Sequence, residues 1–485
     1  MFAQFKRLFK HSAIYAIGSV AQSAVAFLLI PLYTHYLAPA SYGRLEIVNT
    51  FGSIILMVIT FGFTSALMKT YFRDAKNPEE RKQLVGTMFI FVLPIAFAIL
   101  ALLLLIAPGL SAWLLGDAQF AYLFQILLST CFFTIFMNMA FALLRVEERS
   151  KKYTVLFLLR FGVVLALNFY FIMGLKLDAA GVLWANLASF ALVAFSLIPD
   201  VARAASWKFS RFFLRKLWFF GMAIIPASIA VWVMDLSDRY FISIFRDPDE
   251  VGIYALGYKI GMIIDILIVA PFQLAWPTMY FDVSKRGDAP QIYSKVLTYF
   301  VLVGTFVALI LGVLAPEGVR LIADPAYWGA AQVVMLVAIS YVFYGMHFVL
   351  APGIHITNNT KYYPWLIVVP ALANLVLNYF FVPIYGMLGA AVTTFACYIF
   401  VCILTYLMAQ KFYPIKYEWR KMWVIFGLAA AIFAAGLWVT VGNIWLSVLI
   451  KVGLLLLFLL ILYSFGFLRR SDWQKFKLLF ARQKT

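Results

Sequence analysis

Eight ionisable residues interrupt long apolar stretches of this 485-residue sequence. An ionisable side chain inside hydrocarbon is costly unless it is paired or hydrated, so each of the eight is a candidate for binding or transport. A guanidinium or ammonium group can bind an anion such as phosphate, whereas a carboxylate can hold a proton or Na⁺. We interpret the acids as ion-coupling groups or charge partners. The bases are Arg160, Arg239, Lys259 and Lys451, and the acids are Glu46, Asp235, Asp238 and Asp265.

Three of these residues lie within one turn and a half of a predicted helix. Asp235 and Arg239 are four positions apart, so they share a helix face and can pair, with Asp238 beside that face. One interpretation is an ion pair that neutralises itself and stabilises packing. The other is that Arg239 binds substrate, because a planar guanidinium contacts phosphate oxygens through paired hydrogen bonds.

The other bases differ in depth. Arg160 is predicted to lie roughly 10 Å from one end of its helix, and Lys259 about as deep from the opposite side. A diphosphate could therefore meet one after the other, unless Lys259 extends its amine to the membrane surface. Asp265 can bind a coupling proton or Na⁺, or act as a counter-ion for Lys259 or Arg239. Lys451 is excluded from the predicted site because snorkelling or packing explains it.

No metal or cofactor is predicted. His347 and His355 are eight positions apart, a poor spacing for metal ligands, and the sequence has no G-x-x-x-x-G-K loop for ATP. Three prolines, Pro226, Pro271 and Pro277, each remove a backbone donor inside a predicted helix. They are candidate hinges, and ordinary helix kinks are the alternative.

The elements that carry these residues are membrane helices. The chain is 65% hydrophobic and 12% charged, far from the composition of soluble domains. About 20 apolar residues span a bilayer core as a helix, and unbroken apolar runs exclude the alternating strands of a barrel. The first apolar stretch lacks a small-residue cleavage site, so it is no signal peptide. The fold class is therefore all-α, with about fourteen membrane helices. The predicted spans are 11–35, 46–68, 84–108, 119–144, 154–173, 179–199, 217–244, 252–280, 296–315, 329–352, 365–382, 388–409, 422–440 and 445–467.

The positions of the basic residues give the topology. Of 39 Lys and Arg residues, 31 fall in the termini and alternate loops, and four in the intervening loops. Because basic loops stay on the cytoplasmic side, both termini are predicted to be cytoplasmic. The net charge of +18 is thus a topology signal that also favours anionic membrane lipids, and a nucleic-acid partner is not expected. The basic tail from residue 468 is predicted to lie along the inner membrane surface.

A weak internal repeat divides the chain. At an offset of 209 residues, Pro39 matches Pro248 and Gly43 matches Gly252. Each copy has six helices, an even number, so the two copies enter the membrane in the same sense, as parallel repeats. The predicted divisions are an amino-terminal half (1–209), a second half (210–418), and two extra helices with the basic tail (419–485). Paired halves suit alternating access by rocking, and packing alone is the alternative.

Three segments resemble one transporter family. D-R-Y-F-I at 238–242, followed by V-G-I-Y-A-L-G-Y-K-I at 251–260, looks like a signature of its seventh and eighth helices. L-A-P-A-S-Y-G at 37–43 and the segment from Asn374 to Ala391 agree with it. On these residues the chain resembles the polysaccharide-transport and O-antigen flippases, relatives of the multidrug and toxin extrusion exporters within the multidrug/oligosaccharidyl-lipid/polysaccharide superfamily.

The resemblance implies a transporter and not an enzyme. It implies a bacterial inner-membrane flippase that moves an undecaprenyl-pyrophosphate-linked oligosaccharide, an O-antigen, capsule or exopolysaccharide unit, from the cytoplasmic to the periplasmic leaflet. Glycan polymerase and assembly enzymes are its expected partners. Arg160, Arg239 and Lys259 would then contact the pyrophosphate. The alternative is an exporter coupled to H⁺ or Na⁺, which the acids at 235, 238 and 265 keep open.

Overall fold

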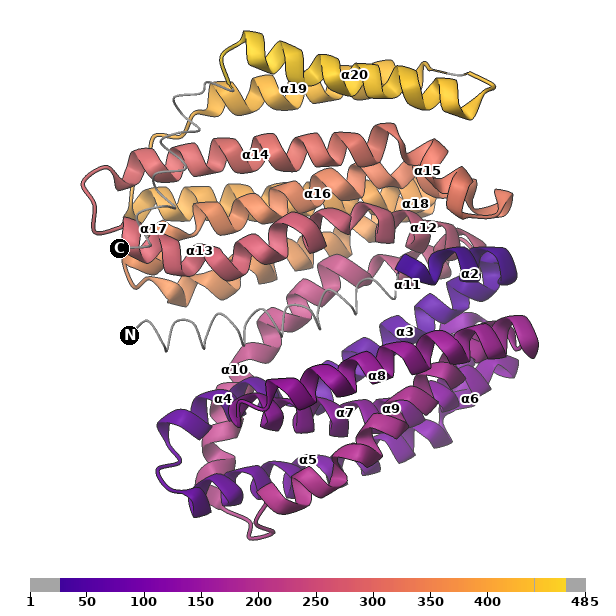
Figure 1. The fold of residues 1–485 in the computed structure, drawn as a ribbon, viewed down its shortest axis with the longest axis vertical. Coiled ribbons are helices and arrows are strands. Elements are labelled where there is room, and N and C mark those ends of the chain that lie inside the picture. The colour runs from indigo at the N-terminus through magenta and orange to yellow at the C-terminus, as the bar shows by residue number, and fades with distance from the viewer. Residues whose placement is uncertain (1–26, 440, 468–485) are drawn as a thin grey trace. The chain divides into compact units, whose positions relative to one another are not determined.

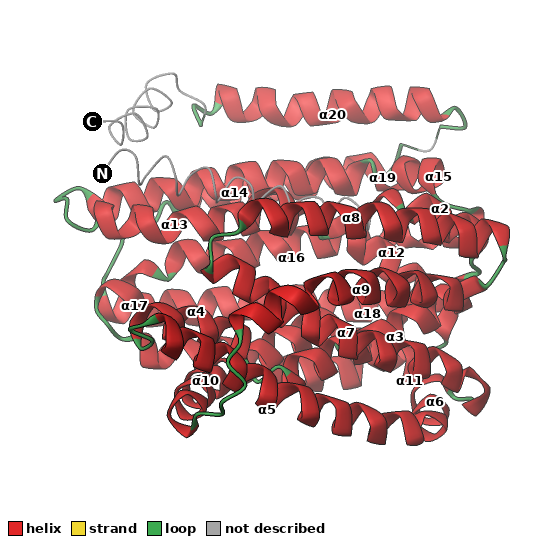
Figure 2. Cartoon of the chain, turned by 60° about the horizontal axis from the view of Figure 1, so that its bottom comes forward, coloured by secondary structure: helices red, strands yellow, loops and turns green. Residues whose placement is uncertain are grey.

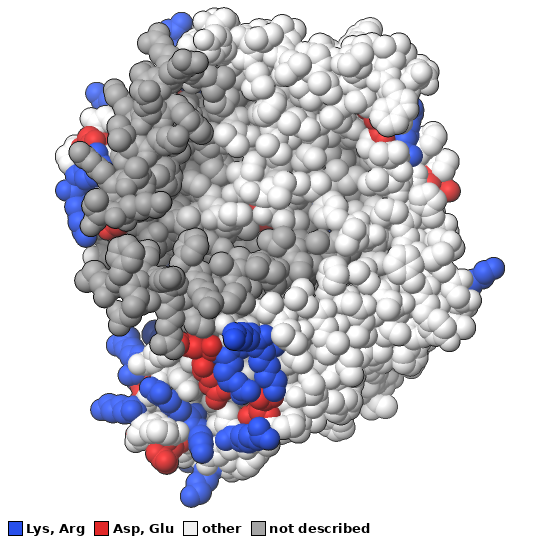
Figure 3. Space-filling model, in the orientation of Figure 1, with Lys and Arg blue, Asp and Glu red and all other residues white. Residues whose placement is uncertain are grey.

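A computed structural model describes residues 27–439 and 441–467, and within them every element is a helix (Figure 2). Twelve of these helices are long and apolar enough to cross a membrane. In the view of Figure 3, Lys, Arg, Asp and Glu gather at the edges of the described surface, and the area between them is almost free of charge. The all-helical, multi-pass membrane architecture expected from the sequence is confirmed.

The count of fourteen spans stays a prediction. The first predicted span, 11–35, lies mostly outside the described residues. Helix α18 (Tyr363–Phe412) has 50 residues, about 75 Å of helix and more than twice a bilayer core. Its backbone breaks at Gly386, where φ is 56° and ψ is −134°. The two predicted spans 365–382 and 388–409 lie on either side of this break.

The described chain forms two compact units. Unit 1 contains residues 27–256, 322–327 and 364–397. Helix α7 is central to it and packs against α9, α5 and α3, while α10 packs against α4. The elements of unit 1 before α12 are α2 (Ile30–Tyr36), α3 (Pro39–Ile59), α4 (Phe63–Arg73), α5 (Pro78–Leu105), α6 (Ala107–Leu115), η1 (Ala118–Phe120), α7 (Ala121–Val146), α8 (Ser150–Asn168), η2 (Phe169–Gly174), α9 (Asp178–Ala204), α10 (Arg211–Leu236) and α11 (Asp238–Phe245).

Unit 2 contains residues 257–321, 328–363 and those from 398 onward. Helix α14 packs against α16 and α19, and α19 lies beside α20 (Figure 1). Three elements, α12, α18 and the short η4, each have residues in both units. The remaining elements are α12 (Pro248–Gly261), η3 (Asp265–Val269), α13 (Ala270–Val283), α14 (Ala289–Val313), α15 (Ala315–Ile322), η4 (Pro325–Ala330), α16 (Ala331–Leu350), α17 (Pro352–Ile356), η5 (Thr360–Tyr362), α19 (Trp419–Leu437) and α20 (Ile444–Ser464).

The two glycines matched by the repeat touch each other in unit 1. A methyl group on Gly43 of α3 would lie 3.0 Å from the backbone nitrogen of Gly252 in α12 and still closer to the carbonyl oxygen of Pro248. Conversely, a methyl group on Gly252 would lie 3.1 Å from the nitrogen of Gly43 and closer to the carbonyl oxygen of Pro39. The contact is reciprocal, and small residues allow such close approach of membrane helices.

Replacing Gly43 with Ala should lower the free energy of unfolding by about 1–3 kcal/mol, because the new methyl group meets backbone that no side-chain rotation can move. Gly252→Ala should cost a similar amount. The double variant should cost less than the sum, since one separation of the helices accommodates both methyl groups. Unfolding in detergent measures this. Gly162→Ala is the matched control, because nothing lies within 4 Å of its added carbon. Additive costs for the two glycines would contradict a shared contact.

Candidate functional site

A break between α10 and α11 positions Arg239. Helix α10 ends at Leu236, Ser237 caps it, and α11 begins at Asp238. The Asp238 carboxylate accepts the backbone N–H of Arg239 at 2.9 Å. The carbonyl oxygen of Asp235, one turn earlier, accepts Nη1 of Arg239 at 2.9 Å. The break therefore holds the guanidinium against the end of α10.

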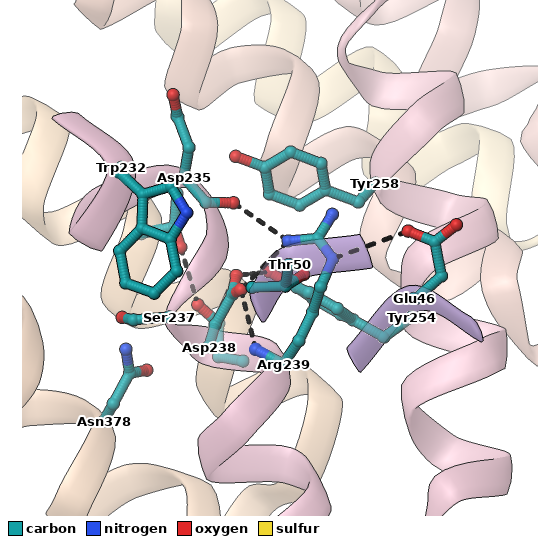
Figure 4. Close-up of polar contacts among 12 residues, drawn as sticks. Glu46, Thr50, Trp232, Asp235, Ser237, Asp238, Arg239, Tyr254, Tyr258 and Asn378 are labelled. Carbon is teal, nitrogen blue, oxygen red and sulfur yellow. Dashed lines mark hydrogen bonds and ion pairs between the residues drawn. The ribbon is translucent and has the colours of Figure 1, made fainter. Parts of the chain in front are cut away.

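Two carboxylates surround this guanidinium (Figure 4). Arg239 Nη1 lies 3.2 Å from Asp238 Oδ1, and its Nε lies 3.9 Å from Glu46 Oε2 of α3. Tyr254 of α12 donates its hydroxyl to the other oxygen of Asp238. Asp238 and Arg239 are 1% and 3% exposed, and Glu46 is 8% exposed. The guanidinium is thus buried beside two buried carboxylates.

A chain of uncharged polar groups continues from the same break. Ser237 donates to Asn374 Oδ1 at 3.4 Å, and Asn378 Nδ2 donates to the same oxygen at 3.0 Å. Thr393 in turn donates to Asn378 Oδ1 at 2.5 Å. Asn374, Asn378 and Thr393 are essentially inaccessible. Buried amides need such partners. The Ser237–Asn374 bond joins the α10–α11 break to α18, and the other two bonds lie within α18.

The structure brings some of the predicted site residues together. Asp235, Asp238, Arg239 and Glu46 meet, and Arg239 contacts Asp235 through that residue's backbone carbonyl. Tyr254 lies within the segment that resembles the family signature, but it is not among the residues predicted for the site. The sequence feature that could have selected Tyr254 is a polar ring in an apolar helix that follows the predicted charge cluster.

Arg160 lies elsewhere in unit 1, on α8. Its guanidinium stacks on the ring of Phe190 from α9, with 3.7 Å between the charge centre and the ring centroid. Its Nε is buried and has no hydrogen-bond acceptor, and no carboxylate in the described chain lies within ion-pair distance of it. Arg160 lies about 15 Å along α8 from its first residue, Ser150, inside an apolar span. An uncompensated charge there is costly, and an anion would relieve that cost.

Lys259 and Asp265 belong to unit 2. Lys259 is in the last turn of α12, and Asp265 begins the π-helical segment η3. Both are half-buried. Their roles in substrate binding and ion coupling stay predictions.

The candidate hinges differ in local structure. Pro226 lies inside α10, which continues unbroken around it, and Pro277 lies inside α13. Pro271 is in the first turn of α13, directly after the π-helical segment η3. A π-helical segment is an identifiable place for a helix to bend, so Pro271 stays the best placed of the three predicted hinges.

Buried histidine in unit 2 is part of a hydrogen-bonded core. The ring nitrogens of His347 lie 2.6 Å from the Thr405 hydroxyl and 2.9 Å from the Tyr363 hydroxyl. No group of three His, Cys, Asp or Glu among the described residues could hold a metal ion.

Comparison with known proteins identifies related chains. Residues 8–280 match the family described as "Polysaccharide biosynthesis protein". The Lsg locus protein 1 of Haemophilus influenzae is 23% identical over 64% of this chain and 76% of its own length. The probable low-salt glycan biosynthesis flippase Agl15 of Haloferax volcanii is 20% identical over 84% of each chain.

Solved structures share the fold. The lipid II flippase MurJ, in an inward closed conformation, matches 95% of this chain and 100% of its own, with a TM-score of 0.72 and 16% identity. An inward-facing multidrug resistance MATE family transporter of the MOP superfamily matches 80% of this chain and 94% of its own, with a TM-score of 0.64 and 16% identity. At these identities the likeness establishes the fold.

Proposed function

Because the chain belongs to the polysaccharide biosynthesis protein family, whose match spans more than half of it, we propose that it is a flippase for lipid-linked oligosaccharide. Its substrate is an undecaprenyl-pyrophosphate-linked glycan unit, moved from the cytoplasmic to the periplasmic leaflet of a bacterial inner membrane by alternating access. Both termini are cytoplasmic, and the enzymes that assemble and polymerise the glycan are its partners. The flippase names of Agl15 and MurJ support this proposal.

The observation that carries the proposal is the guanidinium of Arg160, which has no carboxylate partner among the described residues. An apolar span that holds a cation without a carboxylate is suited to an anionic ligand, and a guanidinium offers two parallel N–H groups to phosphate oxygens. An exporter of organic cations would repel its substrate there. Arg160 is therefore the first pyrophosphate contact in our proposal, and Arg239 and Lys259 are further contacts.

The buried acids also suit a second function, a multidrug or metabolite exporter coupled to H⁺ or Na⁺. The carboxylates of Asp238 and Glu46 lie 3.2 and 3.9 Å from the Arg239 guanidinium. Buried carboxylates can bind a coupling proton or Na⁺. The same site serves a flippase that is driven by an ion gradient, so the acid cluster alone does not favour the exporter over the flippase.

In proteoliposomes, Arg160→Gln should slow protein-dependent exposure of a fluorescent undecaprenyl-pyrophosphate oligosaccharide by about 10- to 100-fold. A hydrogen bond between charged groups contributes about 1.5–3 kcal/mol, which corresponds to that range. The exposure rate of Arg160→Lys should lie between those of Arg160→Gln and the unaltered protein, because lysine keeps the charge but loses the paired N–H geometry. The measurement is the rate at which a membrane-impermeant quencher or enzyme reaches the head group.

Arg320→Gln is the matched control, since this arginine also lies over an aromatic ring, 5.0 Å from the Trp328 centroid, but outside the membrane-spanning helices. Its exchange rate should match that of the unaltered protein. An exposure rate for Arg160→Gln equal to that of the unaltered protein would refute the pyrophosphate contact. Absence of exchange for every glycan tested, together with export of organic cations, would establish the exporter instead.

A further inference from the structure

A second polar site lies in unit 1, where α4, α5, α7 and α9 end together. A cavity of ≈ 240 Å³ is lined there by Tyr71, Arg81, Lys82, Glu147, Asp200 and Arg203, among other residues. These residues fall in or beside the loops that the charge pattern predicts to be cytoplasmic. Figure 3 shows basic and acidic side chains gathered at the lower left, over these helix ends.

The acids of this cavity are already neutralised. Asp200 is 3% exposed and accepts Arg149 Nη2 at 2.7 Å and Lys152 Nζ at 2.5 Å. Glu147 lies 3.3 Å from Arg149 Nη1. The two carboxylates therefore belong to a cluster with two bases of their own, and they leave the other cations of the cavity uncompensated.

Three cations remain. Within the part of the chain that the structure describes, no carboxylate lies within ion-pair distance of Arg81, Lys82 or Arg203. The charge centre of Arg81 lies 4.9 Å from the centroid of the Tyr71 ring, and its Nε is buried without an acceptor. A buried N–H of an arginine that has no acceptor is expensive and marks a place for an anionic oxygen.

The walls of the cavity are preformed. The loop after α9 is tied to α5 by Ser206 N–H, which donates to the Lys82 carbonyl at 2.9 Å, and by Ser210 N–H, which donates to the Thr87 hydroxyl at 3.0 Å. Gly86 lets this loop approach closely, because a side chain at that position would overlap the Ser206 backbone. A rigid pocket loses little entropy when it binds a ligand.

Exposed aromatic rings indicate the source of that ligand. Trp207, between the two tied serines, is 61% exposed, and Phe72, beside Tyr71, is 62% exposed. Large aromatic side chains at helix ends lie at the level of lipid head groups. Each ring belongs to a residue within three positions of one that lines the cavity, Tyr71 or Ala204. A lipid can offer glycerol and acyl chains to such rings, whereas a soluble phosphate gains nothing from them.

We propose that this cavity binds the phosphate of an anionic phospholipid from the adjacent leaflet, with Arg81, Lys82 and Arg203 as its ligands. The site is separate from the buried cluster at Arg239. It does not depend on the flippase function, because lipid binding is measured without transport.

The test is native mass spectrometry of the full-length protein in detergent, titrated with phosphatidylglycerol or phosphatidylcholine. Arg81→Gln/Lys82→Gln should weaken the first phosphatidylglycerol bound by roughly tenfold or more, and should leave phosphatidylcholine unchanged. The matched control is Arg420→Gln/Lys411→Gln, which removes the same two charges from exposed positions on the same predicted side. This control should bind phosphatidylglycerol like the unaltered protein.

Two outcomes would overturn the proposal. Equal weakening in both variants would mean that total basic charge, and not this cavity, attracts the lipid. Displacement of phosphatidylglycerol by millimolar inorganic phosphate, with the same dependence on Arg81 and Lys82, would assign the site to a soluble phosphate. An unchanged melting temperature for both variants, expected because the cations make no ion pair, ensures that a loss of binding reports on the site.

Discussion

Arg239→Met is expected to lower the free energy of unfolding by about 3–5 kcal/mol and to abolish transport. The substitution removes the guanidinium that lies 3.2 and 3.9 Å from the buried carboxylates of Asp238 and Glu46, and removal of one partner of a buried ion pair is strongly destabilising. It also leaves the Asp235 carbonyl without the Nη1 donor that it accepts at the helix break. Unfolding in detergent, followed by circular dichroism, measures the effect.

The control for this substitution is an exposed ion pair of the same unit. Lys216 lies 3.2 Å from Asp74 and is 47% exposed, so Lys216→Met should cost less than about 1 kcal/mol. A cost for Arg239→Met as small as that for Lys216→Met would contradict a tightly coupled buried cluster.

A neutral variant separates the two interpretations of Arg239. In Glu46→Gln/Asp238→Asn/Arg239→Met, the guanidinium and the two carboxylates paired with it are all replaced by neutral groups. Stability should largely return, because neutral replacements of buried ion pairs are often tolerated. If transport returns as well, the cluster acts in packing. If stability returns and transport does not, Arg239 or its carboxylates act on substrate or a coupling ion. Exposure of the same fluorescent lipid in proteoliposomes distinguishes the two results.

The membrane helices could be predicted because hydrocarbon imposes length and polarity directly on the sequence. Helix α5 shows how precisely such boundaries can be predicted. Its predicted span begins at residue 84, whereas the helix begins at Pro78. Asn77 caps it by accepting the N–H of Glu80 at 2.8 Å, and this cap lies in polar sequence before the apolar run. The pattern Asn-Pro-Glu-Glu is a start signal, so the earlier boundary was available from capping preferences and not from hydropathy.

The helix break at the candidate site could not be found in this way. The span predicted as 217–244 is divided into α10 and α11 at Ser237, without a glycine or proline at that point. The division depends on side-chain hydrogen bonds of Asp238 and Ser237, and Ser237 finds its acceptor on Asn374, far away in sequence. A local pattern contains no information about that partner.

Ion pairs between residues far apart in sequence could not be predicted from local patterns either. The sequence selected Glu46 and Arg239 separately, as charges in apolar segments, but they are 193 positions apart, and only the packing of α3 against α11 joins them. Spacing along one helix predicted that Asp235 and Arg239 can pair, and the structure adds the Asp238 carboxylate, which lies 3.2 Å from Arg239. The repeat was more informative, since it selected Gly43 and Gly252, which then proved to be in contact.

Lys451→Met is expected to destabilise the protein by about 3–5 kcal/mol, although the sequence placed Lys451 outside the transport site. Its ammonium group lies 2.6 and 2.9 Å from the two carboxylate oxygens of Glu317 on α15, and Ser447 donates to the same carboxylate at 2.6 Å. Lysine and glutamate are 3% and 9% exposed, so removal of the cation leaves a buried carboxylate with one donor. These contacts hold α20 against the rest of unit 2.

Glu317→Gln/Lys451→Met should recover stability to within about 1 kcal/mol of the unaltered protein, because no unpaired charge is left and Ser447 keeps an acceptor. Lys421→Met is the exposed control; its ion pair with Glu418 is 2.6 Å long but half in solvent, and its loss should cost less than about 1 kcal/mol. Detergent unfolding measures all three. Since the Glu317–Lys451 ion pair anchors α20, which lies outside the predicted repeat, the double variant should also transport normally. Loss of transport in a stable double variant would show that the ion pair between α15 and α20 takes part in the transport cycle.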